Sequence, residues 1–173
     1  MIRLLGKAAI GLSKKEYAEK LIEALYLLMN AYRSAGLLWA ARATCIMAAA
    51  TIVMEGEEDS LVPAKFIPTV KRWAWFALEL RHLPDFLLAM ELLKGCVETL
   101  PLTEDSRDRG RRDIQELEYA LGSIILNLDD AELSQLERLP DILEGLCGIG
   151  ATATVDIIAE RLSVVSTGAA TLA

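Results

Sequence analysis

Apolar residues recur along the chain at helical spacing, most clearly in its first third. One stretch, 14–34, carries a stripe of apolar side chains three or four residues apart: Leu21, Leu25, Leu28 and Tyr32. The stripe breaks at Gly36, a residue that can reverse the chain direction, and a second apolar stretch follows at 37–55. The pattern therefore predicts two helices that fold back on each other.

The rest of the chain also shows helical periodicity, and it shows few strand signals. Pro84 suits the first turn of a helix and Pro101 ends the helix before it, whereas Pro140 should split an otherwise helical run. Linkers are expected at 56–63, which is acidic, and at 102–112, which carries charges of both signs. The predicted helices cover residues 2–12, 14–34, 37–55, 65–81, 84–100, 108–128, 130–147 and 153–165. The expected fold class is all-α.

Small residues lie where the helices of the first hairpin would touch. They are Ala31, Ala41 and Ala48, while Leu28, Tyr32 and Cys45 fill the seam between the helices. With the turn, the stretch has the pattern Leu28, Asn30, Ala31, Tyr32, Gly36, Ala41 and Ala48. This stretch resembles the tetratricopeptide repeat (TPR), which has a Leu-Gly-Asn-Ala-Tyr-like segment, a glycine at the turn and then spaced alanines; Met29 departs from that pattern. The resemblance covers about one repeat. It implies antiparallel helical hairpins stacked as a short TPR-like α-solenoid, with an armadillo- or HEAT-like stack or a helical bundle as the alternative.

A fainter internal repetition extends this pattern along the chain. A shift of 48 residues sets Tyr32 on Leu80 and places a second turn at Leu83 and Pro84, and a shift of 93 residues places a third turn at Asp129 and Asp130. We therefore expect one helical-repeat domain over residues 1–173. Because the first predicted helix lacks a partner and the apolar tail lacks a polar cap, we expect a fragment of a longer repeat protein, or self-association through uncapped ends.

Composition narrows the class of partner. The formal net charge of −7 argues against a nucleic-acid or anionic-membrane binder, because such proteins need cations to neutralise phosphates. The uncharged stretch 43–54 has 12 residues, fewer than the roughly 17–25 that a membrane-spanning helix needs. Cys45, Cys96 and Cys147 form no paired motif and lie in apolar sequence, which indicates buried thiols and a reducing, cytoplasmic setting.

Candidate chemistry is sparse. His82 is the only histidine, with Glu79 and Asp85 each three residues away, but no serine or cysteine lies in a nucleophile motif. One histidine and three scattered cysteines do not supply the paired ligands of a zinc site. We therefore expect no enzyme activity, no metal and no cofactor. The alternative is an all-helical hydrolase or small-ligand-binding protein with an interhelical pocket near His82.

The helix predicted at 65–81 carries several aromatic residues. Trp75 points away from its main apolar stripe, so it either packs on the next repeat or is an exposed anchor for a partner. The residues expected in the core are Phe66, Val70, Trp73, Ala77 and Leu80.

In TPR proteins the first helix of each repeat lines a concave groove, and the resemblance implies which residues would do so here. They are Glu23, Tyr26, Asn30, Arg33, Lys71, Leu78, Arg81, Glu116, Tyr119 and Ser123. The implied function is a non-catalytic protein–protein interaction or scaffold module whose groove binds a peptide or a partner protein. The family's clamp for chaperone C-terminal carboxylates expects lysine where Tyr26 stands, which argues against that ligand.

Overall fold

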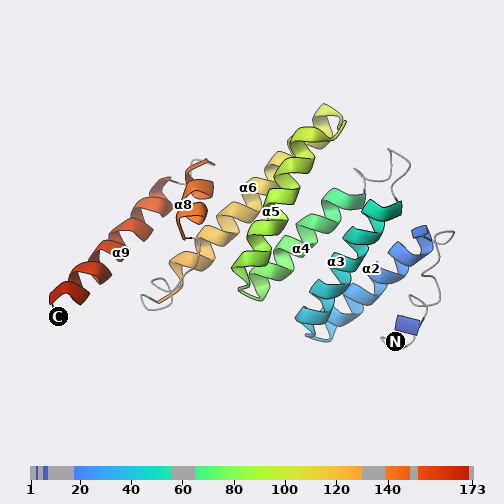
Figure 1. Ribbon diagram of the computed structural model, residues 1–173, viewed down its shortest axis with the longest axis horizontal. Coiled ribbons are helices and arrows are strands. Elements are labelled where there is room, and N and C mark those ends of the chain that lie inside the picture. The colour runs from blue at the N-terminus through green and yellow to red at the C-terminus, as the bar shows by residue number, and fades with distance from the viewer. Residues whose placement is uncertain are drawn as a thin grey trace. The chain divides into compact units, whose positions relative to one another are not determined.

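A computed structural model describes residues 3, 6–7, 18–55, 65–129, 139–148 and 152–171, with side chains described as far as residue 163. All regular secondary structure in these residues is helical, which confirms the all-α prediction. The helices are α2 (Ala18–Ser34), α3 (Leu38–Glu55), α4 (Ile67–Glu79), α5 (Leu83–Thr99), α6 (Glu104–Leu126), α8 (Leu139–Gly148) and α9 (Thr152–Thr171) (Figure 1).

The chain forms two compact units, Met1–Ile114 and Gln115–Ala173, and the boundary falls within α6. The first unit contains the hairpins α2–α3 and α4–α5 and the beginning of α6. The second contains the rest of α6 together with α8 and α9. No helix built from the described residues combines the length and the apolar character needed to cross a membrane.

The first hairpin packs as its sequence predicts. Helices α2 and α3 lie side by side (Figure 1), and α3 also contacts α4. Leu25 and Leu28 of α2 are buried, as are Cys45 and the small residues of α3 that face them, whereas Tyr32 is half-buried. Small side chains allow close approach of the two helix axes, and Ala31, Ala41 and Ala48 are 5% exposed or less.

The second hairpin repeats this arrangement with larger side chains. Helices α4 and α5 pack on each other (Figure 1). Of the expected core stripe, Leu80 is half-buried and the other members are buried, namely Phe66, Val70, Trp73 and Ala77. Trp75, which points away from this stripe, is half-buried rather than fully exposed. Phe86 and Leu93 complete the core from α5.

The two hairpin turns share one backbone geometry. In the first turn, Gly36 has φ 72° and the amide of Leu37 donates to the carbonyl of Tyr32 at 2.9 Å. In the second turn, Arg81 has φ 53° and the amide of His82 donates to the carbonyl of Ala77 at 2.8 Å. Both are Schellman motifs, in which a residue in the left-handed region ends the helix. Arg81 lies 45 residues after Gly36, so the repeat interval is 45 and the predicted shift of 48 is wrong. The second turn therefore precedes Leu83 and Pro84, which belong to α5.

Charged residues join neighbouring hairpins at a constant separation in sequence. Lys65 pairs with Glu19 at 3.3 Å and Arg33 with Glu79 at 2.7 Å, and each pair is 46 residues apart. A constant separation means that α2 and α4 run parallel. In the same way Arg42 of α3 pairs with residue Asp85 of α5. The hairpins of the first unit therefore stack side by side: α3 packs on α4, and ion pairs link α2 with α4 and α3 with α5.

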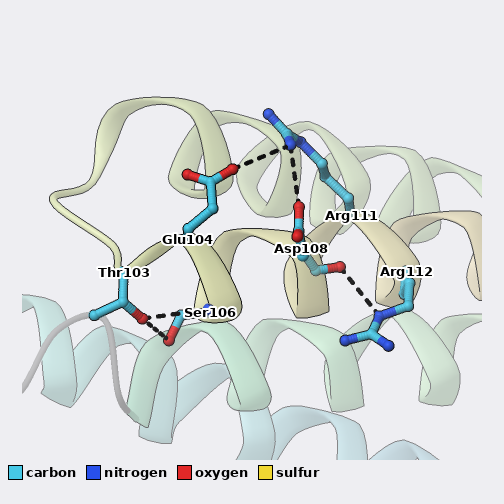
Figure 2. A network of polar contacts seen from close by, with 6 residues as sticks. All are labelled: Thr103, Glu104, Ser106, Asp108, Arg111 and Arg112. Carbon is cyan, nitrogen blue, oxygen red and sulfur yellow. Dashed lines mark hydrogen bonds and ion pairs between the residues drawn. The ribbon is translucent and has the colours of Figure 1, made fainter.

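The charged segment after Pro101 is helical from Glu104, so the linker predicted at 102–112 is wrong and the helix predicted at 108–128 begins four residues earlier. Thr103 caps α6 by accepting a hydrogen bond from the amide of Ser106 at 3.3 Å, which satisfies an end-of-helix donor (Figure 2). Arg111 pairs with Asp108 at 3.2 Å, one turn away. Mixed charges at this spacing stabilise an exposed helix, which explains why so polar a stretch is ordered.

The second unit has a small core of its own. The buried residues are Leu117, Leu121, Ile125, Ile142, Leu146 and Ile158. Arg161 of α9 donates to the carbonyls of Leu126 and Leu128 at 3.2 and 2.6 Å, and so satisfies acceptors at the end of α6. Pro140 lies in the first turn of α8. The predicted helix at 2–12, the linker at 56–63, residue Asp130 and the run 131–138 lie wholly or mostly outside the described residues.

Candidate functional site

The predicted groove residues of α2 share one side of that helix, where they meet α4. Glu23 and Asn30 are exposed, Arg33 has 60% of its side chain exposed, and Tyr26 is half-buried. Across from them, Arg72 and Glu79 of α4 are also exposed. We call the exposed residues of this surface, Glu23, Asn30, Arg33, Arg72 and Glu79, the α2–α4 face.

Tyr26 anchors α2 to the start of α4 rather than facing solvent. Its hydroxyl forms a hydrogen bond with the hydroxyl of Thr69 and lies 3.3 Å from the carbonyl oxygen of Lys65. The Thr69 hydroxyl in turn donates to that carbonyl at 2.6 Å, so this buried polar group is satisfied. The guanidinium of Arg72 lies 5.3 Å from the centre of the Tyr26 ring, a cation–π contact. Tyr26 therefore supports the α2–α4 face from beneath.

Arg33 is held in place at the other end of the face. Besides its ion pair with Glu79, its guanidinium lies 5.8 Å from the ring centre of Phe76. These contacts fix the direction of an exposed cation without burying it. Lys65, Arg72 and Glu79 were not among the predicted site residues. A shift of 46 residues from Glu19, Tyr26 and Arg33 would have found them.

The remaining predicted residues of the first unit have different environments. Lys71 pairs with Asp113 of α6 at 2.7 Å and is half-buried, so it joins α4 to α6. Leu78 is 3% exposed and belongs to the core, so its predicted place in an open groove is wrong. The shift of 48 residues set Asn30 on Leu78, whereas the observed interval of 45 sets Asn30 on Trp75, which is half-buried. Arg81 is exposed at the turn after α4.

Glu116, Tyr119 and Ser123 belong to the second unit. All three are exposed on one side of α6, and Tyr119 has 55% of its surface accessible. The Ser123 hydroxyl donates to the carbonyl of Tyr119 at 3.0 Å, which is a contact within the helix. They form a separate exposed stripe on the second unit.

His82 lies in a cluster that joins α3 to α5. Its Nδ1 atom is 3.5 Å from a carboxylate oxygen of Asp85, and that carboxylate also pairs with Arg42. The His82 ring meets the ring of Trp39 edge-on, with centroids 5.5 Å apart. Glu79, the other carboxylate expected near His82, pairs with Arg33 instead. The cluster connects two helices, and it does not test the alternative of a catalytic role for His82.

The cysteines differ in environment. Cys45 is buried, and its thiol donates to the carbonyl of Thr69 at 3.2 Å. Burial raises the pKa of the Cys45 thiol to about 12, against a smaller opposing effect of Arg72. Burial also raises the pKa of Cys96, which is half-buried. Cys147 on α8 is exposed, so the expectation of three buried thiols is wrong at that position.

Comparisons with known proteins identify no relative of this chain. No protein-family model, curated protein sequence or solved structure matches it. Within the part of the chain that the structure describes, no three histidine, cysteine or acidic side chains gather as a metal site would require.

Proposed function

We propose that the protein is a TPR-like interaction module that binds a peptide or a partner protein on the α2–α4 face, without chemistry of its own. The observation that carries this proposal is the parallel alignment of α2 and α4 at one constant register. Pairs 46 residues apart, including Arg33 with Glu79, connect the two helices, while Asn30 and Glu23 stay exposed beside them.

The chemistry of this face suits an extended peptide. The amide of Asn30 can donate and accept a hydrogen bond at once, as the main chain of an extended peptide requires. Arg33 and Arg72 are oriented by contacts with Phe76 and Tyr26, so binding them costs less side-chain entropy than binding mobile arginines. Glu23 and Glu79 add negative charges beside these arginines, so the face favours a polar peptide that carries both acidic and basic side chains.

The conformation of Arg81 also supports a surface role for α4. A left-handed backbone costs a residue with a side chain about 1–2 kcal/mol, and Gly36 avoids that cost in the first turn. Strained positions of this kind cluster at functional sites, where the side chain makes contacts that glycine could not make. We infer that the Arg81 side chain extends the binding surface at the end of α4.

Panning a random library of 12-residue peptides on the whole chain tests the proposal. Enriched peptides should lose about tenfold in affinity with Asn30→Ala, because the loss of a hydrogen bond costs about 1–1.5 kcal/mol, and should also weaken with Glu23→Ala. Glu98→Ala, an exposed carboxylate change on α5, is the matched control and should leave Kd unchanged. Failure to enrich any peptide, or binding insensitive to both α2 variants, would rule out this face.

A further inference from the structure

Helix α3 presents an apolar stripe to solvent on the side opposite its buried face. Trp39, Met47 and Met54 are 53%, 58% and 78% exposed and lie seven or eight residues apart, two turns of helix. Ala43 and Ala50 are exposed between them. We call these five residues the α3 stripe. Within α3 before its last residue, Arg42 is the one charged side chain, and it pairs with a carboxylate of α5.

The stripe continues onto α5. Leu88 and Leu92 lie 45 residues after Ala43 and Met47, at equivalent positions of the next hairpin, and are 46% and 37% exposed. Together these side chains expose an apolar area on the order of 400 Å². That equals the largest patches of typical monomers and about half of the roughly 800 Å² that each partner contributes to a standard interface. Polar residues around the stripe would supply the remaining half as a rim.

The five residues of the α3 stripe carry no charge, and the one guanidinium beside them, that of Arg42, lies 5.2 Å from the centre of the Trp39 ring and is paired with Asp85. Charged groups of a partner would lose their hydration on this surface without gaining an ion pair, which costs free energy. An uncharged helical stripe of similar length is complementary to this surface, and the chain itself carries one. A two-fold axis between Ile46 and Met47 of paired antiparallel α3 helices would set residue 39 opposite 54 and residue 43 opposite 50.

This pairing is also sterically favourable. Ala43 would face Ala50 of the second copy on both sides of the axis, so the two helices can approach closely. Trp39 would face Met54 of the second copy, a sulfur–aromatic contact. We propose that the α3 stripe is the interface of a homodimer in which two copies pack their α3 helices antiparallel. This surface differs from the chain ends and from the α2–α4 face, so it does not depend on the proposed function.

Sedimentation velocity from about 1 to 100 µM tests the dimer. The wild type should shift from monomer to dimer with concentration, and the dimer should strengthen with added NaCl, because each copy carries a net charge of −7 and salt screens the repulsion. Met47→Glu sets two carboxylates against each other near the axis and should raise the dimer Kd at least about tenfold. Leu27→Glu on α2 is the matched control, because Leu27 is also 58% exposed, and it should leave the dimer unchanged.

Cross-linking locates the interface independently of affinity. In a Cys147→Ser background, Met47→Cys should form an intermolecular disulfide on mild oxidation, since equivalent positions lie next to each other at a two-fold axis, whereas Leu27→Cys should not. Far-UV circular dichroism establishes that each variant keeps its helix content. A wild type that stays monomeric at about 100 µM, equal effects of the two glutamate variants, or a monomer that instead floats with phosphatidylcholine vesicles would overturn the proposal.

Discussion

Two glycines offer a test in which the same substitution should act in opposite directions. Gly36 ends the first hairpin turn with φ 72°, whereas Gly95 lies inside α5. At both positions an added Cβ would meet nothing within 4 Å, so packing does not distinguish them. Any difference between Gly36→Ala and Gly95→Ala must therefore come from backbone conformation.

The expected magnitudes follow from that conformation. Alanine in the left-handed region costs about 1–2 kcal/mol, and its stiffer unfolded chain returns about 0.4–1 kcal/mol, so Gly36→Ala should destabilise by about 1 kcal/mol. Within a helix alanine is better than glycine by about 0.5–1 kcal/mol, so Gly95→Ala should stabilise by that amount. The two variants should differ by about 2 kcal/mol. Arg81→Gly relieves the left-handed cost at the second turn and should stabilise by about 0.5–1 kcal/mol.

Urea titration followed by tryptophan fluorescence is the appropriate assay. All three tryptophans, Trp39, Trp73 and Trp75, lie in the first unit, so their fluorescence reports the unfolding of that unit alone. The midpoint should fall for Gly36→Ala and rise for Gly95→Ala and Arg81→Gly at an unchanged m-value. A rise for both alanine variants, or a loss on Arg81→Gly, would refute the assignment of the two turns as equivalent Schellman motifs.

Three further predictions concern the contact between α5 and α6 and the buried thiol. An added Cβ on Gly110 would lie 2.5 Å from Cγ2 of Val97, so Gly110→Ala should lower the free energy of unfolding by about 1–3 kcal/mol. Val97→Ala should offset part of that loss in the double variant, and strictly additive losses in urea titrations would mean that the two residues do not touch. Iodoacetamide at pH 8 should alkylate Cys147 long before Cys45, as mass spectrometry of the peptides can measure; equal rates would contradict the burial of Cys45. Because the pKa of Cys45 rises from 9.0 to about 12 on folding, the unfolded thiol ionises first, so the stability that this thiol contributes is complete below pH 9 and is lost between pH 9 and 12. Cys45→Ala should therefore lose less stability over that interval than the wild type, and parallel losses would be evidence against the shift.

The first hairpin was predictable because its signals are local. The stripe ending at Tyr32, the glycine at the turn and the spaced alanines each report on neighbours a few residues away, and the structure places α2 and α3 within a few residues of the predicted ends. The second turn was harder to find. Its left-handed position holds Arg81 rather than glycine, and Pro84 indicates a helix start three residues further on.

The three-residue error in the position of the second turn changes which residues of α4 are assigned to the candidate site. The shift of 48 residues sets Asn30 on Leu78, a core residue, and Arg33 on Arg81, whereas the ion pair of Arg33 with Glu79 spans 46 residues. Pairs between hairpins depend on the register of two distant helices, and a single sequence constrains that register weakly. The start of α6 was predicted four residues late, at residue 108, because charges of both signs after Pro101 favour a linker, whereas Thr103 caps a helix that begins at Glu104.

The central claim is that α2 and α4 lie parallel and in contact, as stacked hairpins require. Cross-linking between cysteines placed at Arg33 and Glu79 tests it most directly, because the charged ends of these two long side chains are 2.7 Å apart and a short linker can replace their reach. In a Cys147→Ser background, Arg33→Cys with Glu79→Cys should be cross-linked within one chain by the short thiol reagent dibromobimane. Arg33→Cys with Arg72→Cys, two helical turns or about 10 Å out of register, should not. Equal cross-linking of both pairs, or none of either, would contradict the stack.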